Sequence, residues 1–349
     1  MITNRKKGII LFAIIGATAV CLCLNDANRN KSPYIKSDQI VYETDSIEVP
    51  HVATKEFDRE GNFHLLAQLG IGKSGKANPD RDAFVVKTNV DTGKSQELYE
   101  QKDENWAYKA DGWFRNYATY GDEMLCADFT SEKLTYGKPT PCLAVIDLKT
   151  QKETLWNLSA LYGKAVFSEE GEYIDQLVWL NKKVVALVSG NSVMRIDIKK
   201  GELSQQSKIA EEPLANWNLS GTVLSYVVKR DGRYIFEAVD LEDMKKLVSI
   251  NAGSWRPGFG EYDMLYCDGA VYKTDKKYLY RYSFEKKEYE KIYSGIKMQE
   301  TSMDPNTGEK YYNYGRLYGV KKDCIYLMHV SEYAGECSFC RVHKLVLRT

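Results

Sequence analysis

The chain has no excess of charge of either sign. Lysine plus arginine and aspartate plus glutamate number 48 each, so the formal net charge is zero. No basic run follows Lys7. Without a positive net charge or a basic stretch, the chain offers no electrostatic footprint for nucleic acid. The sequence therefore predicts no nucleic-acid partner.

Histidine is scarce, and the familiar catalytic motifs are missing. The 349 residues include only four histidines, namely His51, His64, His329 and His343. Their spacing supports no Ser–His–Asp arrangement, and the phosphate-loop, G-x-S-x-G and H-E-x-x-H motifs are absent. The sequence thus leaves any catalytic residue unknown, predicts no metal and no cofactor, and favours a binding protein over an enzyme.

Helical patterns are also lacking. After residue 30 the chain shows no convincing amphipathic stretch of about ten or more residues with helical periodicity. It does contain 25 tyrosines and six tryptophans. Aromatic residues are enriched in strands and depleted in disordered chains. The sequence therefore predicts an ordered all-β domain.

A strand–turn–strand pattern recurs along the chain. An apolar-alternating strand runs into a short polar turn and a second strand, and the turns begin at Asp91, Lys149, Lys199, Glu242 and Glu285. Successive turns lie 43 to 58 residues apart. A four-stranded propeller blade repeats about every 40–50 residues. The spacing predicts a β-propeller over residues 47–349.

The last repeat, from about Thr301 to Thr349, is one strand short. The segment Gln39–Val52 is apolar enough to supply that strand, and closing a ring with the other terminus removes an open sheet edge. Five recognised hairpins and this closing unit predict six four-stranded blades. The blade number is seven if the long interval between Asp91 and Lys149 hides a degenerate blade.

The N-terminus carries an export signature. Arg5, Lys6 and Lys7 precede 17 uncharged residues, Gly8 to Leu24. A basic segment before an apolar run targets a chain to the membrane, although this run is at the short limit for a spanning helix. Three outcomes stay open: cleavage after Ala19, an uncleaved signal-anchor, or lipidation at one of two further residues, Cys21 or Cys23.

Residues 25–46 are polar and poor in aromatic residues. Such a composition is typical of a flexible tether. The sequence thus predicts a membrane-targeting segment (1–24), a tether (25–46) and a propeller that works outside the cytoplasmic membrane. The domain is membrane-anchored if the segment is retained and secreted if it is cleaved.

Six cysteines remain beyond the targeting segment. An even number of cysteines in an exported domain suggests disulfides. Cys126 and Cys142 flank a hairpin loop, and a symmetric hairpin centred on Leu134 places them directly opposite each other. The spacing therefore predicts a cross-strand disulfide between them.

The last repeat holds a cluster of potential metal ligands: Cys324, Cys337, Cys340 and His343. Two thiolates at C-x-x-C spacing and two more ligands could hold zinc, and the same spacing occurs at redox sites. Strand alternation, however, places Cys337 and Cys340 on opposite faces of a sheet. The alternation favours disulfides or buried thiols over a metal site.

Aromatic residues gather at two places, and the candidate ligand-binding residues are Trp106, Trp113, Tyr117, Tyr311, Tyr312 and Tyr314. Aromatic rings beside polar groups can bind sugars or peptides because a ring face buries a large area. The alternative is that these rings pack between blades. We expect at least one cluster to line the central channel.

Two short segments resemble known bacterial propellers. FSEEGEYI, Phe167 to Ile174, resembles the FSPDGKYI-type strand start of TolB-like propellers, with Glu169 in place of proline. FDREGNFHLL, Phe57 to Leu66, is similar to the strand start of NHL-type six-bladed propellers. The resemblance implies a bacterial envelope propeller used for binding, and it carries over no catalytic residues.

The sequence as a whole indicates an extracytoplasmic, membrane-tethered propeller that binds a ligand or an envelope protein. A glycan or small ligand would sit at the mouth of the central channel. The alternative is a propeller enzyme of the lyase, hydrolase or cyclotransferase type that acts on glycans or peptides. Fold class does not decide between the two.

Overall fold

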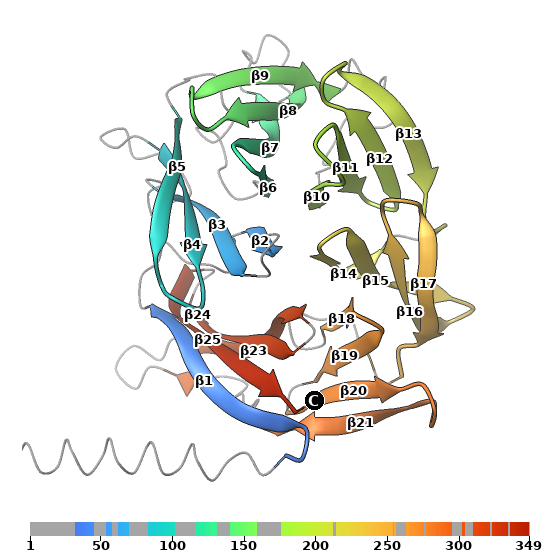
Figure 1. Cartoon of the computed structure of the whole chain (residues 1–349). Helices are drawn as coiled ribbons and strands as arrows, with labels where there is room; N and C mark the ends of the chain where they lie inside the picture. Colours follow the sequence, from blue (N-terminus) through green and yellow to red (C-terminus); the bar gives the residue numbers. More distant parts are fainter. Residues whose placement is uncertain are drawn as a thin grey trace, which may run out of the picture.

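Strands are the main secondary structure of the described residues in the computed structural model, as the alternating sequence predicts. They form six antiparallel sheets arranged as blades around a central channel (Figure 1). The structure describes residues 32–44, 54–57, 62–69, 83–101, 116–130, 140–158, 176–211, 214–253, 255, 263–275, 277–294, 302–303, 310–321, 323–333 and 336–348.

The first five blades are four-stranded sheets whose strands follow chain order from the channel outward. Blades one and two comprise β2 (Thr54–Phe57), β3 (Phe63–Leu69), β4 (Ala83–Asn89) and β5 (Ser95–Gln101), then β6 (Asn116–Tyr120), β7 (Glu123–Thr130), β8 (Thr140–Asp147) and β9 (Lys152–Asn157). Blade three comprises β10 (Gln176–Trp179), β11 (Val184–Ser189), β12 (Ser192–Asp197) and β13 (Glu202–Lys208). Blades four and five comprise β14 (Ala215–Ser220), β15 (Val223–Arg230), β16 (Arg233–Asp240) and β17 (Lys245–Asn251), then β18 (Met264–Cys267), β19 (Ala270–Thr274), β20 (Leu279–Ser283) and β21 (Glu288–Tyr293).

Blade six joins the two ends of the chain. Its strands are β23 (Lys310–Lys321), β24 (Cys324–Tyr333), β25 (Glu336–Leu347) and β1 (Ile35–Thr44), and the short β22 (Ser302–Met303) pairs with the start of β23. β23 lies beside β18 of blade five and is the inner strand. β1 pairs antiparallel with β25 and is outermost, so the N-terminal strand closes the ring as predicted.

Two details differ from the sequence-based expectation. The closing strand is Ile35–Thr44 and not Gln39–Val52, so part of the stretch 25–46 expected to be a tether belongs to the propeller. The described residues between Asp91 and Lys149 form the end of blade one and most of blade two. They leave no additional sheet there, and the described blades number six and not seven.

The repeated turn between the third and fourth strands has a common local chemistry. In blade two, Asp147 Oδ1 accepts hydrogen bonds from the backbone N of Lys149 at 3.0 Å and of Thr150 at 2.8 Å. Asp197 repeats this pattern in blade three. Each of these turns ends on a left-handed residue: Gly93, Gln151, Gly201, Met244 and Lys287. Aspartate favours such turns by bonding the backbone two residues ahead.

The cores lie between adjacent blades. One cluster between blades two and three includes the fully buried Leu143, Leu187 and Met194. Another, between blades six and one, packs Phe63 against Tyr326 with ring centroids 4.6 Å apart. Because each blade buries both faces against its neighbours, no blade has a complete core of its own.

One carboxylate is completely buried. Glu237 of β16 has 0% side-chain exposure and accepts hydrogen bonds or ion pairs from four groups, Tyr226, Arg230, Lys246 and Ser249, at 2.8 to 3.0 Å. Burial alone would raise the pKa of Glu237, but the hydrogen bonds from Lys246, Tyr226 and Ser249 outweigh burial and lower it. The carboxylate therefore stays charged and joins β15, β16 and β17.

The predicted targeting segment, residues 1–24, lies outside the described residues. No helix among those that the structure describes is long and apolar enough to cross a membrane.

Candidate ligand site at the channel mouth

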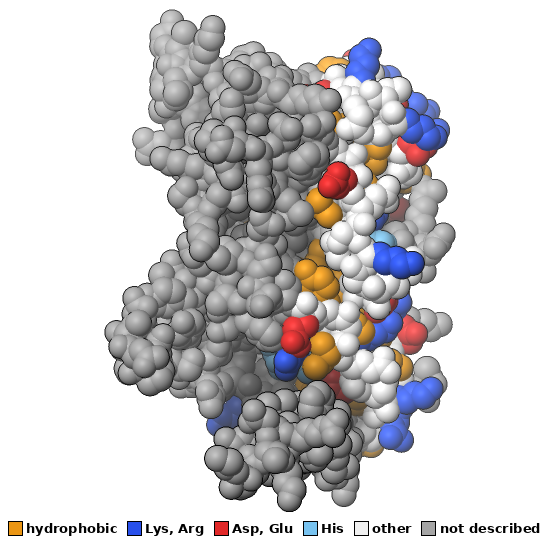
Figure 2. Space-filling view, turned by 90° about the vertical axis from the view of Figure 1, so that its left-hand side faces the viewer, with side chains coloured by type: hydrophobic (Ala, Val, Ile, Leu, Met, Phe, Trp, Pro, Cys, Tyr) orange, Lys and Arg blue, Asp and Glu red, His pale blue; other side chains and the backbone are white. Residues whose placement is uncertain are grey.

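One face of the ring is made of short turns. Because strands alternate in direction within each blade, the first-to-second and third-to-fourth strand connections lie on the same face. We call this the turn face. Its described residues include 121–122, 181–183, 221–222, 268–269 and 323 in the first-to-second connections. In the third-to-fourth connections they are 90–94, 148–151, 198–201, 241–244 and 284–287. In a side view of the ring, Lys and Arg side chains stand along the right-hand edge, with Asp and Glu side chains among them (Figure 2).

A cavity of about 540 Å³ opens at the end of the channel beside the turn face. Its walls come from β2, β6, β10 and the turns that follow β10 and β14, with Tyr318 of β23 as a further contributor. The inner strands of several blades thus converge on one space. This volume lies within the range of about 300–1,000 Å³ that is usual for small-molecule sites.

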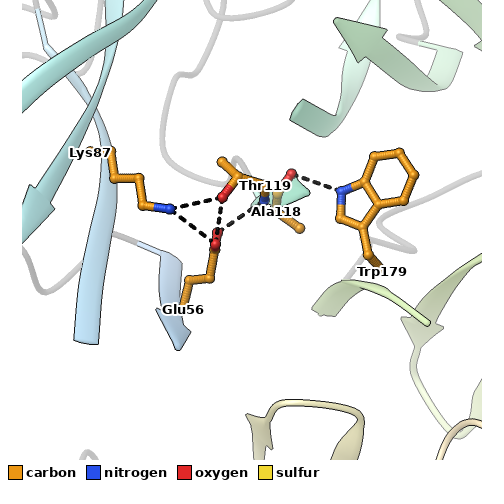
Figure 3. A network of polar contacts seen from close by, with 5 residues as sticks. All are labelled: Glu56, Lys87, Ala118, Thr119 and Trp179. Carbon is orange, nitrogen blue, oxygen red and sulfur yellow. Dashed lines mark hydrogen bonds and ion pairs between the residues drawn. The ribbon is translucent and has the colours of Figure 1, made fainter. Parts of the chain in front are cut away.

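A polar network joins blades one and two at the cavity wall (Figure 3). The carboxylate of Glu56 accepts hydrogen bonds from the backbone N of Thr119 at 2.9 Å and from the Thr119 hydroxyl. Lys87 Nζ lies 3.2 Å from Glu56 Oε1 and 2.9 Å from Thr119 Oγ1. The Glu56 and Lys87 side chains are 14% and 17% exposed, so both charges keep access to the cavity.

Aromatic rings form another part of the wall. Trp179 is buried and its Nε1 donates to the backbone oxygen of Ala118 at 3.1 Å. The Tyr120 ring lies 5.4 Å from that of Trp179, centroid to centroid. Tyr117 and Tyr318 also line the cavity. Hydrogen bonding and packing fix these rings, so the cavity combines rigid apolar surface with one ion pair.

A second cavity of about 790 Å³ lies between blades one and two on the turn face. Lys87, Thr119 and Gly121 line both cavities. The rest of the second wall is polar, with side chains such as Thr92 and Gln151. The shared residues make the polar network the boundary between the channel mouth and the inter-blade groove.

The described lining of the channel cavity contains one carboxylate. Glycoside hydrolysis commonly needs two carboxylates flanking the scissile bond. Among the described residues that line the channel cavity, Glu56 is the single carboxylate, and it is engaged by Lys87 and Thr119. No group of three or more potential metal ligands occurs in the described part of the chain.

Of the aromatic residues predicted to bind a ligand, the structure places one at the channel cavity. Tyr117 lines the channel cavity. Trp106 and Trp113 lie outside the described residues. Tyr311, Tyr312 and Tyr314 are in β23, where the backbone pairs them with Tyr333, Glu332 and Val330, and their side chains are not among those described.

Sequence reasoning did not identify Glu56, Lys87, Thr119 or Trp179. Each sits in a short strand where an isolated polar or aromatic residue has no distinguishing pattern. The one usable signal was position, because Glu56 and Thr119 lie in first strands of their blades and first strands line the channel.

The predicted pairing of Cys126 and Cys142 is corrected by the strand register. Cys126 lies opposite Ala144, and Cys142 lies opposite Asp128. The register of β7 and β8 is therefore shifted by two residues from the one that would pair Cys126 with Cys142. No disulfide is found among the described residues, which do not include these two cysteine side chains.

The cysteines of blade six do not gather into one site. Cys324 lies opposite Val346, whereas Cys340 lies opposite Val330. These positions are six residues apart along β24, which corresponds to roughly 20 Å. Cys324 is a buried free thiol, and burial raises its pKa. The backbone register therefore separates Cys324 from Cys340 along the sheet, and the side chains of Cys337 and Cys340 lie outside those described.

Comparison with known proteins gives no family. No family model matches the chain, and no curated protein matches it. Among solved structures, a chain in the crystal structure of the mitotic checkpoint complex is similar with a TM-score of 0.41 and 8% identity, covering 88% of this chain and 93% of that one. The computationally designed Ika8 protein gives a TM-score of 0.37 and 10% identity, covering 84% and 96%. Likenesses of this level carry no argument about function.

Proposed function

We propose that the protein is an extracytoplasmic, membrane-tethered binding module that takes a small polar ligand, a short glycan or peptide, at the turn-face end of its channel. The observation that supports this function most is the cavity of about 540 Å³ with an ion pair and buried aromatic rings in its wall. The export signature of residues 1–24 supports the location.

The lining favours a ligand that has both donors and acceptors. Lys87 offers an ammonium, Gln176 offers an amide, and Trp179 and Tyr117 supply ring surface. Small-molecule sites typically combine apolar walls with a few fixed polar groups that set orientation. Because the Glu56–Lys87 pair is held by Thr119, these charges are preorganised and little ordering is needed on binding.

The test is a thermal-shift screen of the full-length protein against neutral oligosaccharides and short peptides, followed by titration of each compound that stabilises it. We expect Lys87→Met to weaken binding of a true ligand by about tenfold or more, the effect of losing one charge-assisted hydrogen bond. Lys182→Met, at an exposed turn beside the cavity, is the matched control and should leave the affinity unchanged.

Two results would contradict the proposed site. One is a ligand whose affinity is the same in the native protein and the Lys87→Met variant. The other is the absence of any stabilising compound together with stoichiometric capture of an envelope protein, which would make the domain a scaffold without a ligand of its own.

A further inference from the structure

Blade three presents four lysines together on the turn face. Lys182 and Lys183 are in its first turn, Lys199 and Lys200 are in its second turn, and all four are exposed. The two turns are adjacent, because the backbone N of Ile198 donates to the oxygen of Lys183 at 2.9 Å. Four positive charges therefore share one end of one blade.

Both turns are rigid, and their own polar side chains are used internally. Asn181 Oδ1 accepts from the backbone N of Lys183 at 2.9 Å, and Asp197 Oδ1 accepts from that of Lys199 at 3.0 Å. The second turn ends on Gly201 in the left-handed region. The backbone is held by these bonds, so the lysine side chains project from a fixed platform.

None of the four lysines has a carboxylate partner among the described residues, as is also true of Lys94 and Lys287 elsewhere on this face. One lysine at or beside the second turn of each of blades two, four and five is paired: Lys149 with Asp122 at 2.7 Å, Lys246 with Glu237 at 2.8 Å and Lys286 with Glu290 at 2.6 Å. Among the described residues, no ion pair involves any of the four lysines of blade three. Their charge is therefore available to an external anion.

The N-terminal strand begins on the same face. Ile35 lies opposite Leu347, whose backbone N donates to Asp323 in the first turn of blade six at 2.8 Å. Blade three lies across the ring from β1 (Figure 1). The seven residues 25–31 that precede the described Ser32 can span at most about 25 Å, so a membrane-held segment before them keeps this edge of the ring near the bilayer.

We infer that the turn face docks on an anionic lipid bilayer through Lys182, Lys183, Lys199 and Lys200, with the N-terminal tether as the second attachment point on the opposite side of the ring. This inference rests on the tethering part of the proposed function. Clustered lysines are attracted to anionic lipid within a Debye length of about 8–10 Å. Two attachments across the ring orient the domain, with the cavity mouth toward the membrane surface.

The test places the full-length protein in vesicles of phosphatidylcholine alone or with about 30% phosphatidylglycerol, and isolates the vesicles by flotation. A short pulse of an acetylating reagent, read by mass spectrometry, then reports how accessible each lysine is. Lys229 is the control, because it is exposed and lies at the opposite end of β15 from the turn face.

We expect the four lysines to be acetylated about fivefold more slowly in the anionic vesicles than in the neutral ones, with the difference lost in high salt. Lys229 should react equally in both. In a variant that combines Lys182→Gln, Lys183→Gln, Lys199→Gln and Lys200→Gln, Lys152, which is exposed at the turn-face end of β9 in the adjacent blade two, should lose any lipid-dependent protection. Equal rates in the two vesicles, or protection that does not depend on lipid charge, would overturn the docking.

Flotation separates the two claims. If the protein floats with both vesicle types but its lysines react equally, the tether stands and the docking is wrong. If it floats only with anionic vesicles, the docking stands and the tether is wrong. If it floats with neither, both are wrong.

Discussion

The seam where β1 closes the ring contains a histidine whose protonation should destabilise the fold. His329 of β24 packs against His343 of β25, with ring centroids 4.8 Å apart, and its Nε2 is buried with no hydrogen-bond partner among the described residues. His343 Nδ1 pairs with Asp38 of β1 at 2.9 Å, and Asp38 also accepts from Tyr293 of blade five at 2.6 Å. A charge placed on His329 therefore has no acceptor at Nε2.

The magnitude follows from the pKa. Burial, with smaller contributions from His343 and Arg341, lowers the pKa of His329 from 6.5 to about 4. At pH 5 the unfolded chain is protonated at this residue while the folded chain is not, so the stabilisation present above pH 6.5 is lost as the pH falls toward 4. From 6.5 to 5, at about 1.4 kcal/mol per unit, the loss is about 2 kcal/mol.

The assay is urea unfolding followed by tryptophan fluorescence at pH 7.5 and pH 5, on the native protein and on His329→Gln. The native protein should lose about 2 kcal/mol more than the variant between the two pH values, because glutamine does not titrate. The stabilisation from Glu237, whose pKa is lowered, is present above about pH 4.5 and is lost only below it, outside this interval. The same pH dependence in both proteins would refute the reasoning.

Three further predictions concern the turns and the buried carboxylate. Gly201→Ala should lower the free energy of unfolding by about 2–4 kcal/mol, because the backbone is left-handed there and the new Cβ would meet the Trp156 ring. The matched Gly93→Ala has the same φ of 66° but open space around it, so it should lower the free energy of unfolding by only about 1 kcal/mol. Equal losses of stability in thermal unfolding would contradict this. Lys287→Gly should stabilise the protein by about 0.5–1 kcal/mol, since this exposed residue has a φ of 56°, and a lower unfolding midpoint would argue against it. Glu237→Gln should destabilise by about 3 kcal/mol in urea unfolding, because two cationic side chains lose their buried partner; an unchanged midpoint would show that the network is not stabilising.

The repeat was predictable because its signal is local. Aspartate begins the turn in blades two and three, and an aspartate two to four residues before a left-handed position can be read without any knowledge of the fold. Strand alternation then follows from the buried faces. The propeller could therefore be predicted from the repeat, whose spacing left six or seven blades, and closure of the ring was predicted from the strand missing in the last repeat.

The ends of β1 and the hairpin register could not be predicted so well, for a physical reason. β1 is an outermost strand with exposed residues such as Ile40 and Gln39, so its composition resembles a linker. The register of β7 and β8 depends on the centre of a nine-residue connection, 131–139, whose sequence allows several centres. Neither feature leaves a local pattern.

The cavity residues were hidden because they act together only across blades. Glu56, Lys87 and Thr119 come from β2, β4 and β6, and nothing in the neighbourhood of one indicates the others. Tyr117 was identified because it belongs to an aromatic cluster near the start of a blade. A site assembled from inner strands becomes visible only once the ring is closed.

The most direct test of the ligand site is hydrogen–deuterium exchange of the full-length protein with and without a ligand found in the screen. The account predicts slower exchange at the Thr119 amide, which bonds Glu56, and in the turns 181–183 and 221–222 that line the cavity. Protection confined to the outer strands β9, β13 and β17, with the channel mouth unchanged, would contradict it.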